Sequence, residues 1–292
     1  MDVPSNQFIA SGRDFRAARI ALFGAPYDST CSYRPGTRSG PDAVRRESYG
    51  IETYSPLQDA DLEDVSFFDC GDLELPFGAP EKPLEAIESR ASEILDAGKM
   101  PYLVGGEHLV TLGAVRAALP RHPGLKIVHF DAHADLRDDY LGNRLSHATV
   151  MRRCLELLKG DGVKLWQFGI RSGTREEFAM KENCGICREP FSAEGAKSLS
   201  IEDPVYLSVD MDVLDPSEFP GTGTPEAGGV RYAALLDAVL SVIRNCNVVA
   251  LDMVELSPPL DPTGRSTALA CKYLRETILA ACAADEMRSA RK

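Results

Sequence analysis

The sequence predicts an α/β protein built as a three-layer αβα sandwich, with a mainly parallel central sheet between two layers of helices. Three observations lead to this prediction. Short apolar runs recur along the chain, segments with helical spacing lie between them, and acidic and histidine residues follow several of the runs. Strands that alternate with helices typically form parallel sheets covered on both faces.

Seven apolar runs are the predicted strands, and each is four to six residues long. Their residues are mostly apolar rather than strictly alternating in polarity, which is typical of strands that are buried on both faces. In chain order the predicted strands are residues 18–23, 65–68, 101–104, 126–130, 164–168, 205–209 and 248–251.

Five segments with apolar residues at helical spacing are the predicted helices, and they cover residues 83–97, 109–119, 147–158, 232–243 and 267–283. The sequence contains no internal repeat, low-complexity tract or linker rich in Pro, Gly and Ser that divides the chain. We therefore expect a single domain that covers residues 1–292.

Composition narrows the class of protein. A chain of 292 residues that is 44% hydrophobic can bury a sizeable core. Its apolar runs fall far short of the ~20 residues that cross a bilayer, and the N-terminus lacks an export signal, so we expect a cytoplasmic protein without a membrane partner. The net charge of -12 argues against a nucleic-acid partner and is compatible with a small cationic substrate.

The eight cysteines are scattered through a chain that is too long to need a disulfide scaffold, and we expect most to be reduced. Cys184 and Cys187 form one CxxC motif. Since no second cysteine pair lies nearby, we interpret this segment as a loop with two free thiols rather than a structural zinc site.

Chemically active side chains follow four of the predicted strands. The strand at 101–104 leads to Gly105-Gly106-Glu107-His108, and the strand at 126–130 leads to Asp131, His133 and Asp135. The strand at 205–209 leads to Asp210 and Asp212, and the last strand leads to Asp252 and Glu255. Ligands of open α/β sheets bind beyond the carboxyl ends of the strands, so these residues mark the candidate site.

The spacing of the acids indicates a metal centre. In DAHAD (131–135) and DMD (210–212), a period of two points the polar side chains to one side of an extended backbone. Several carboxylates in one site repel each other and lose hydration, and divalent cations resolve this conflict. A single Asp after a strand is usually a turn former or helix cap, so the conjunction of both motifs with His108 carries the inference.

The donor types indicate which metal. Carboxylates with one or two imidazoles and no thiolate suit Mn²⁺ or Mg²⁺, and the histidines favour Mn²⁺. Two such ions about 3.5 to 4 Å apart can share carboxylates and lower the pKa of a bridging water toward neutrality. The sequence therefore predicts two Mn²⁺ ions per chain.

With these residues assigned, the chain resembles the ureohydrolases, the family of arginase, agmatinase and related guanidino hydrolases. The resemblance covers nearly the whole chain. It rests on five segments in order: GAPYDSTCSYRPGTRSGPDAVRRES (24–48), GGEH (105–108), HFDAHADL (129–136), SVDMDVLDPSEFPGTGTPEAGG (208–229) and ALDMVELSPPLDPTG (250–264).

The resemblance implies an arginase-like fold and a ligand set for each metal ion. One Mn²⁺ would be bound by His108, Asp131, Asp135 and Asp210. The other would be bound by Asp131, His133, Asp210 and Asp212, so that Asp131 and Asp210 bridge the two ions. It also implies that a metal-bound hydroxide attacks the guanidinium carbon and that the reaction yields urea and a primary amine.

Further roles follow from the resemblance. Glu255 would pair with the guanidinium, with Asp252 as its supporting neighbour. His147 would relay protons to the departing amine, although Ala148 replaces the glycine that usually follows this histidine. The segment 221–225 is interpreted as a rigid wall with Thr224 facing the substrate. His122 and His129 have no motif support and are assigned to surface or packing roles.

The segment RPGTRSGP (34–41) resembles the agmatinase branch, so we predict hydrolysis of agmatine to putrescine and urea, a step of polyamine biosynthesis. Asp138, Asp139 and Tyr140 are candidates to accept the free ammonium of agmatine. Arg137 and Arg144 in the same stretch leave open a carboxylate-bearing substrate, such as guanidinobutyrate or guanidinopropionate.

Three other functions stay open beside agmatine hydrolysis. These are arginase, guanidinobutyrase or guanidinopropionase activity on the same site, a catalytically silent metal-binding protein, and an amide deacetylase that uses one zinc ion. The family resemblance also implies a homo-oligomer of three or six chains.

Overall fold

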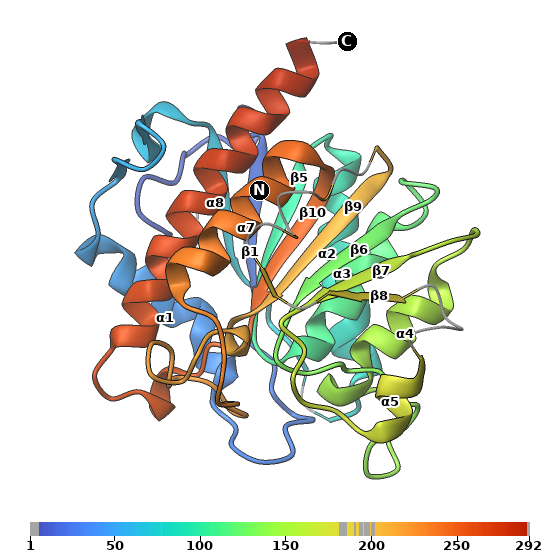
Figure 1. Ribbon diagram of the computed structural model, residues 1–292. Coiled ribbons are helices and arrows are strands. Elements are labelled where there is room, and N and C mark those ends of the chain that lie inside the picture. The colour runs from blue at the N-terminus through green and yellow to red at the C-terminus, as the bar shows by residue number, and fades with distance from the viewer. Residues whose placement is uncertain are drawn as a thin grey trace.

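The computed structural model describes residues 6–76, 78–180, 186–189, 191–192, 195, 199 and 202–290. An eight-stranded sheet crosses the molecule in the order β4-β1-β5-β10-β9-β6-β7-β8 (Figure 1). Every pair of neighbouring strands in this sheet is parallel. The predicted α/β class with a parallel central sheet is therefore confirmed.

The predicted strands lie close to those of the sheet, which are β1 (Ile20–Ala25), β4 (Phe67–Asp72), β5 (Met100–Gly105), β6 (Lys126–Phe130), β7 (Leu165–Phe168), β9 (Pro204–Asp210) and β10 (Asn247–Val254). The sequence analysis missed the edge strand β8 (Ile186–Glu189) and the two-stranded antiparallel sheet of β2 (Tyr54–Ser55) and β3 (Ala60–Asp61). The CxxC motif involves Cys184, which lies outside the described residues.

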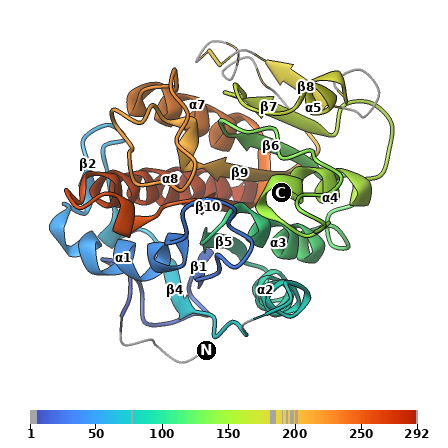
Figure 2. The ribbon, with the colours of Figure 1, turned by 90° about the horizontal axis from the view of Figure 1, so that it is seen from below.

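The helices are α1 (Gly40–Glu47), α2 (Glu81–Asp96), α3 (Thr111–Ala118), α4 (Val150–Leu157), α5 (Arg175–Ala179), α7 (Tyr232–Asn245) and α8 (Arg265–Ala290). Helices α1, α7 and α8 cover one face of the sheet, and α2, α3 and α4 cover the other (Figure 2). In the part of the chain that the structure describes, no helix is long and apolar enough to cross a membrane.

Burial on both faces explains the continuous apolar runs. In β1, Ile20 and Leu22 pack into the hydrophobic core beneath α7 and α8, while Ala21 and Phe23 pack into the core beneath α2 and α3. Successive side chains of a strand point to opposite faces, so a strand covered on both faces needs apolar residues at every position.

Strand order determines where the candidate site forms. The four strands that lead to chemically active residues, β5, β10, β9 and β6, are consecutive neighbours in the middle of the sheet. Because they are parallel, their carboxyl ends lie at one edge of the sheet. His108, Glu255, Asp210 and Asp131 follow or end these strands and therefore come together there.

Candidate metal centre and active site

His108 lies at the centre of a group of carboxylates. Its Nδ1 atom lies 3.1 Å from an Asp131 oxygen, 3.3 Å from an Asp135 oxygen and 3.2 Å from an Asp210 oxygen. The ring is buried, and Nδ1 makes no hydrogen bond among the described residues. Although burial opposes protonation, these carboxylates raise the pKa of His108 well above its usual value. The three carboxylates around Nδ1 therefore need a positive charge among them, either a proton on Nδ1 or a bound cation.

The other ring nitrogen of His108 shows how that charge can be supplied. Nε2 lies 2.9 Å from the Ser208 hydroxyl, which donates its proton to Asp252 Oδ1 at 2.8 Å. Because Ser208 has used its only proton, it accepts from His108 Nε2–H. The neutral ring then carries its lone pair on Nδ1, which faces the carboxylates as a metal-ligating nitrogen does. The donor set fits a divalent cation.

A second group shares Asp131 with the first. His133 Nδ1 lies 2.9 Å from Asp212 Oδ2 and 3.4 Å from Asp131 Oδ1. His108 contacts Oδ2 of Asp131, so the two oxygens of this carboxylate face different histidines. Asp131, His133 and Asp212 together can hold a metal ion. A carboxylate shared in this way suits a bridge between two ions.

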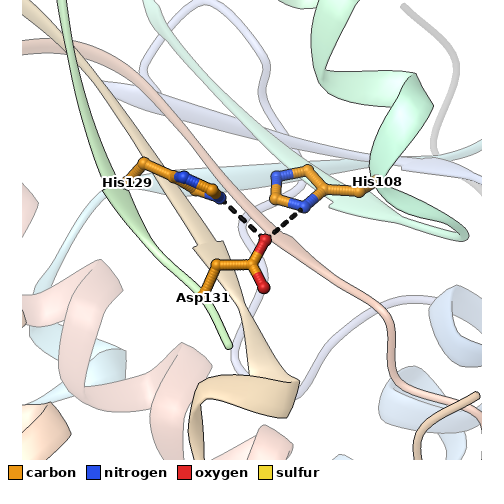
Figure 3. A group of neighbouring side chains, drawn as sticks. All are labelled: His108, His129 and Asp131. Atoms are coloured by element: carbon orange, nitrogen blue, oxygen red, sulfur yellow. Dashed lines mark hydrogen bonds and ion pairs between the residues drawn. The ribbon is translucent and has the colours of Figure 1, made fainter. Parts of the chain in front are cut away.

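His129 has a more specific role than the surface or packing role expected from the sequence. Gln167 Nε2 donates to the Ala134 carbonyl at 2.8 Å and lies 3.1 Å from His129 Nδ1, which makes Nδ1 an acceptor. The proton is then on Nε2, which lies 2.8 Å from Asp131 Oδ2 and donates to it. Figure 3 shows both the His129 and His108 rings directed at this carboxylate. A period of two already placed His129 and Asp131 on one side of the strand.

Asp252 supports His108 rather than Glu255. Its carboxylate accepts hydrogen bonds from the hydroxyls of Thr111, Tyr206 and Ser208 and from the Val209 amide. Through Ser208 it orients the His108 ring. The sequence analysis named Asp252 as a neighbour of Glu255 and missed Ser208, because the link between them crosses from β9 to β10.

Glu255 lies beside the carboxylate groups in an uncommon backbone conformation. Its φ is 67°, and that of Asp135 is 53°, in the left-handed region that residues with a Cβ atom rarely adopt. The Glu255 amide donates to the Gly106 carbonyl at 2.9 Å, and its Oε1 accepts from the His108 amide at 2.7 Å. Burial and the neighbouring Glu107 raise the pKa of Glu255 well above its usual value. Strained residues of this kind are typical of functional sites.

A cavity of about 620 Å³ opens above these residues. Among the side chains that line it are His108, His133, Asp135, Asp210, Asp212, Glu255, His147 and Thr224. Of the predicted ligands only Asp131 is missing from the lining, and it is fully buried beneath the cavity-lining histidines that it contacts. Thr224 donates to Asp212 Oδ2 at 3.4 Å.

His147 enters the cavity from the start of a short 3-10 helix, His147–Thr149. Ser146 caps this turn, and its own amide donates a hydrogen bond to the Thr149 hydroxyl oxygen. His147 Nε2 lies 3.4 Å from the Ser32 hydroxyl, and its ring packs edge-on against Tyr140 with the centroids 5.6 Å apart. Burial lowers the pKa of His147.

Asp138 and Asp139 do not line the cavity. Asp138 Oδ1 lies 2.6 Å from Arg153 and 3.4 Å from Arg144, so it belongs to a surface ion-pair network. Asp139 accepts from the Gly142 amide at 3.2 Å in a turn. Their predicted contact with the substrate is therefore not supported by their positions, because arginine partners and local turn geometry hold both side chains elsewhere.

Comparisons with known proteins bear on the same residues. A family model described as the arginase family matches residues 18–280. The chain belongs to the arginase family. It is 43% identical to the agmatinase of Bacillus anthracis and 44% identical to that of Bacillus subtilis, in each case over 93% of this chain and 95% of the relative.

A solved structure supports the same assignment. The agmatine ureohydrolase of Thermoplasma volcanium superposes with a TM-score of 0.84 at 33% identity, over 95% of this chain and 94% of that one. The predicted ureohydrolase family, arginase-like fold and agmatinase-like branch are thus confirmed, and the chain is an agmatinase-like ureohydrolase.

Proposed function

We propose that this chain is a dinuclear manganese agmatinase that hydrolyses agmatine to putrescine and urea. The observation that carries the proposal is that two histidines and three aspartates line one cavity, with the buried Asp131 in contact with both histidines and with Glu255 and His147 in the same lining. This arrangement supports the roles that we assign: metal ligands to the histidines and aspartates, a guanidinium partner to Glu255 and a proton carrier to His147.

The ligand sets combine the two groups of contacts with the bridging role of Asp210 that the family resemblance implies. His108, Asp131, Asp135 and Asp210 would hold one Mn²⁺, and Asp131, His133, Asp210 and Asp212 would hold the other. Ions bound there would act as Lewis acids and would lower the pKa of a bound water toward neutrality. The chain's own contribution is to fix the histidine tautomers, through Ser208 for His108 and through Gln167 for the supporting His129.

Glu255 binds the guanidinium of the substrate. Its buried carboxylate is costly to ionise on its own, as its raised pKa reflects, so a planar cation with several N–H donors is a favourable partner. Hydrolysis then breaks the bond between the guanidinium carbon and the alkyl nitrogen. His147 delivers a proton to that nitrogen, and putrescine and urea leave.

The other charged residues that line the cavity favour a cationic tail over a carboxylate. Arg34 donates to the carbonyls of Thr222 and Gly223, and Arg137 stacks on Tyr140 and lies 3.5 Å from Glu177, so both arginines already have partners. Glu226 lines the cavity with a half-exposed side chain, and no arginine among the described residues contacts its carboxylate. We assign Glu226 as the acceptor for the ammonium of agmatine.

The deciding experiment assays purified, Mn-loaded protein against agmatine, arginine, guanidinobutyrate and guanidinopropionate, with metal content measured on the same sample. We expect the highest kcat/KM with agmatine and two Mn²⁺ per chain. Higher kcat/KM with any of the other three guanidines contradicts the substrate assignment. One zinc per chain supports an amide deacetylase, and bound metal without turnover of any guanidine supports a silent metal-binding protein.

We also propose that residues 1–292 act as a single domain, in the cytoplasm, within a trimer or hexamer. The family resemblance supports this proposal. Light scattering on the purified protein tests the oligomer, and a mass of one chain contradicts it.

A further inference from the structure

Three segments that are distant in the sequence meet at Thr30. These are the loop after β1, the GGEH segment after β5, and the start of the turn that carries His147. The Thr30 hydroxyl donates to Glu107 Oε1 at 2.6 Å, and the Thr30 amide lies 3.1 Å from Oε2 of the same carboxylate. The His147 amide donates to the Thr30 hydroxyl oxygen at 3.1 Å.

In these hydrogen bonds each donor is defined: the His147 amide donates to the Thr30 hydroxyl, and that hydroxyl donates to Glu107. A hydroxyl has a single proton, and Thr30 gives it to a carboxylate, so its lone pairs remain for the His147 N–H. Donation to a carboxylate oxygen polarises the hydroxyl and makes its own oxygen a better acceptor. Glu107, Thr30 and His147 are therefore coupled rather than merely adjacent.

No cationic side chain in the part of the chain that the structure describes explains the burial of Glu107. Its side chain is fully buried, and among the described residues no Arg, Lys or His side chain lies within ion-pair distance of it. Burying a carboxylate destabilises the folded protein unless hydrogen bonds replace those that it made to water. The Glu107 carboxylate accepts hydrogen bonds from the hydroxyl and amide of Thr30 and from the Cys31 thiol, and of these two residues Thr30 also contacts His147.

The backbone at Glu107 is fixed independently of its side chain. Its amide donates to the Tyr27 carbonyl at 2.7 Å, and a Cβ on the preceding Gly106 would lie 1.9 Å from the same oxygen. This close approach holds the loop after β1 against the end of β5. The Glu107 side chain therefore extends to Thr30 from a fixed backbone, and its hydrogen bonds to Thr30 restrict the position of the His147 amide as well.

We propose that Glu107 and Thr30 are positioning residues that hold His147 in the place from which it delivers a proton to the departing amine. The inference rests on the proposed function, because it needs His147 to act in catalysis. Loss of the Thr30 hydroxyl should therefore slow turnover while leaving the metal centre and substrate binding intact.

The test compares Thr30→Val, Thr30→Ser, His147→Asn and the double variant Thr30→Val/His147→Asn, all as Mn-loaded full-length protein with agmatine. Valine keeps the shape and the amide contact with Glu107 but removes the hydroxyl. We expect Thr30→Val to lower kcat about ten- to hundredfold, with a change in KM below about threefold and unchanged Mn content. Thr30→Ser, which restores the hydroxyl, should recover most of the loss.

The double variant separates this inference from the proposed function. If Thr30 acts through His147, its substitution should have little further effect once His147 is replaced. Multiplied losses in the double variant, or Mn loss in Thr30→Val, would overturn the positioning role while leaving the function intact. Near-normal turnover of His147→Asn would overturn the catalytic role of His147, and the inference with it. A Glu107→Gln variant should repeat the Thr30→Val pattern with a smaller loss of kcat, and Mn loss or an unchanged kcat in that variant would also contradict the proposal.

Discussion

At the scale of single residues, the tautomer of His108 decides whether its buried nitrogen can bind a cation. Ser208 and Asp252 fix that tautomer from the side of the ring that faces away from the carboxylates. Outer hydrogen bonds of this kind typically contribute 10- to 100-fold to metal affinity. Ser208 and Asp252 therefore matter for metal binding at His108, although neither belongs to the DxHxD or DxD motif.

We predict that Ser208→Ala lowers the affinity for Mn²⁺ by about 10- to 100-fold, because the His108 ring loses the acceptor that holds Nδ1 toward the carboxylates. Titration calorimetry with Mn²⁺ measures this directly. Excess Mn²⁺ should restore most of the turnover. Ser241→Ala, which removes a serine whose hydroxyl accepts from Asn245 within α7, serves as the matched control and should bind Mn²⁺ normally. Unchanged affinity in Ser208→Ala contradicts the assigned tautomer.

Glu226 carries the prediction on substrate choice. Glu226→Gln removes the negative charge that we assign to the ammonium of agmatine, so KM for agmatine should rise about tenfold, roughly 1.4 kcal/mol, with a smaller change in kcat. The preference for agmatine over guanidinobutyrate should narrow by a similar factor. Steady-state kinetics on both substrates provide the check. An equal loss on both substrates indicates that Glu226 supports His133 instead, which lies 3.9 Å away.

Side chains at the ends of strands could be predicted from the sequence, whereas their hydrogen-bond partners on other strands and helices could not. His108, Asp131 and Asp210 could be predicted because each follows or ends an apolar run. The contact of Ser208 with His108 and that of Gln167 with His129 cross between strands, and no local pattern encodes them. The ion pair of Asp138 with Arg153 of α4 could not be predicted for the same reason.

At the scale of elements, the runs that define β5, β6, β9 and β10 could be predicted because burial on both faces imposes a simple pattern. Helix α1 was missed because it has eight residues and begins with Gly40 and Pro41, which weaken a helical pattern. Its position depends on a buried ion pair, in which Arg45 reaches Asp69 at 2.7 Å and also contacts Asp72. Such a pair forms only once α1 and β4 are side by side.

We predict that Arg45→Met destabilises the fold by about 3 to 5 kcal/mol, because it leaves the Asp69 carboxylate buried without its cation. Urea denaturation followed by circular dichroism measures the free energy of unfolding. The neighbouring Arg46 is the matched control, since its side chain is 64% exposed and pairs with Asp42 on the surface. Arg46→Met should change stability by less than about 0.5 kcal/mol. Equal effects of the two substitutions contradict the role of the buried pair.

The start of α8 gives a prediction on pH. Although burial opposes its ionisation, hydrogen bonds from Thr263 and Ser266 lower the pKa of Asp261 to about 2. Because this pKa lies below the unfolded value of about 3.9, the stabilisation is present above pH 4 and is lost as pH falls toward 2. Asp261→Asn should therefore cost about 1 to 2 kcal/mol at pH 7, and the difference from wild type should shrink below pH 4.

Thermal melts from pH 3 to pH 7 test this expectation, with the exposed Asp64→Asn as control. A difference in Tm between wild type and Asp261→Asn that stays constant from pH 3 to pH 7 contradicts the lowered pKa of Asp261. Ser266 also accepts from the Gly221 amide at 2.9 Å, so the same variant should loosen the segment that carries Thr224.

At the scale of the whole molecule, the parallel sheet draws like charges together at its carboxyl edge. Asp131, Asp210 and Asp212 are buried there, and burial together with neighbouring carboxylates raises the pKa of Asp210 well above its usual value. The fold therefore concentrates charge that is unfavourable until a cation binds. The sequence predicted this cluster, and its energetic consequence is that metal and fold are linked.

We predict that Mn²⁺ stabilises the folded protein in proportion to the logarithm of its free concentration, since a cation bound to the folded state alone contributes RT ln(1 + [L]/Kd). At 100 times Kd this is about 2.7 kcal/mol, which raises Tm by about 4 °C in a chain of this size. Differential scanning calorimetry on EDTA-treated protein with increasing Mn²⁺ measures the shift. The Asp131→Ala variant is the control, because it lacks the carboxylate that both groups share and should show little of the shift. A wild-type Tm that does not respond to Mn²⁺ contradicts the metal centre, whereas an equal response in Asp131→Ala means that Mn²⁺ binds elsewhere on this acidic chain.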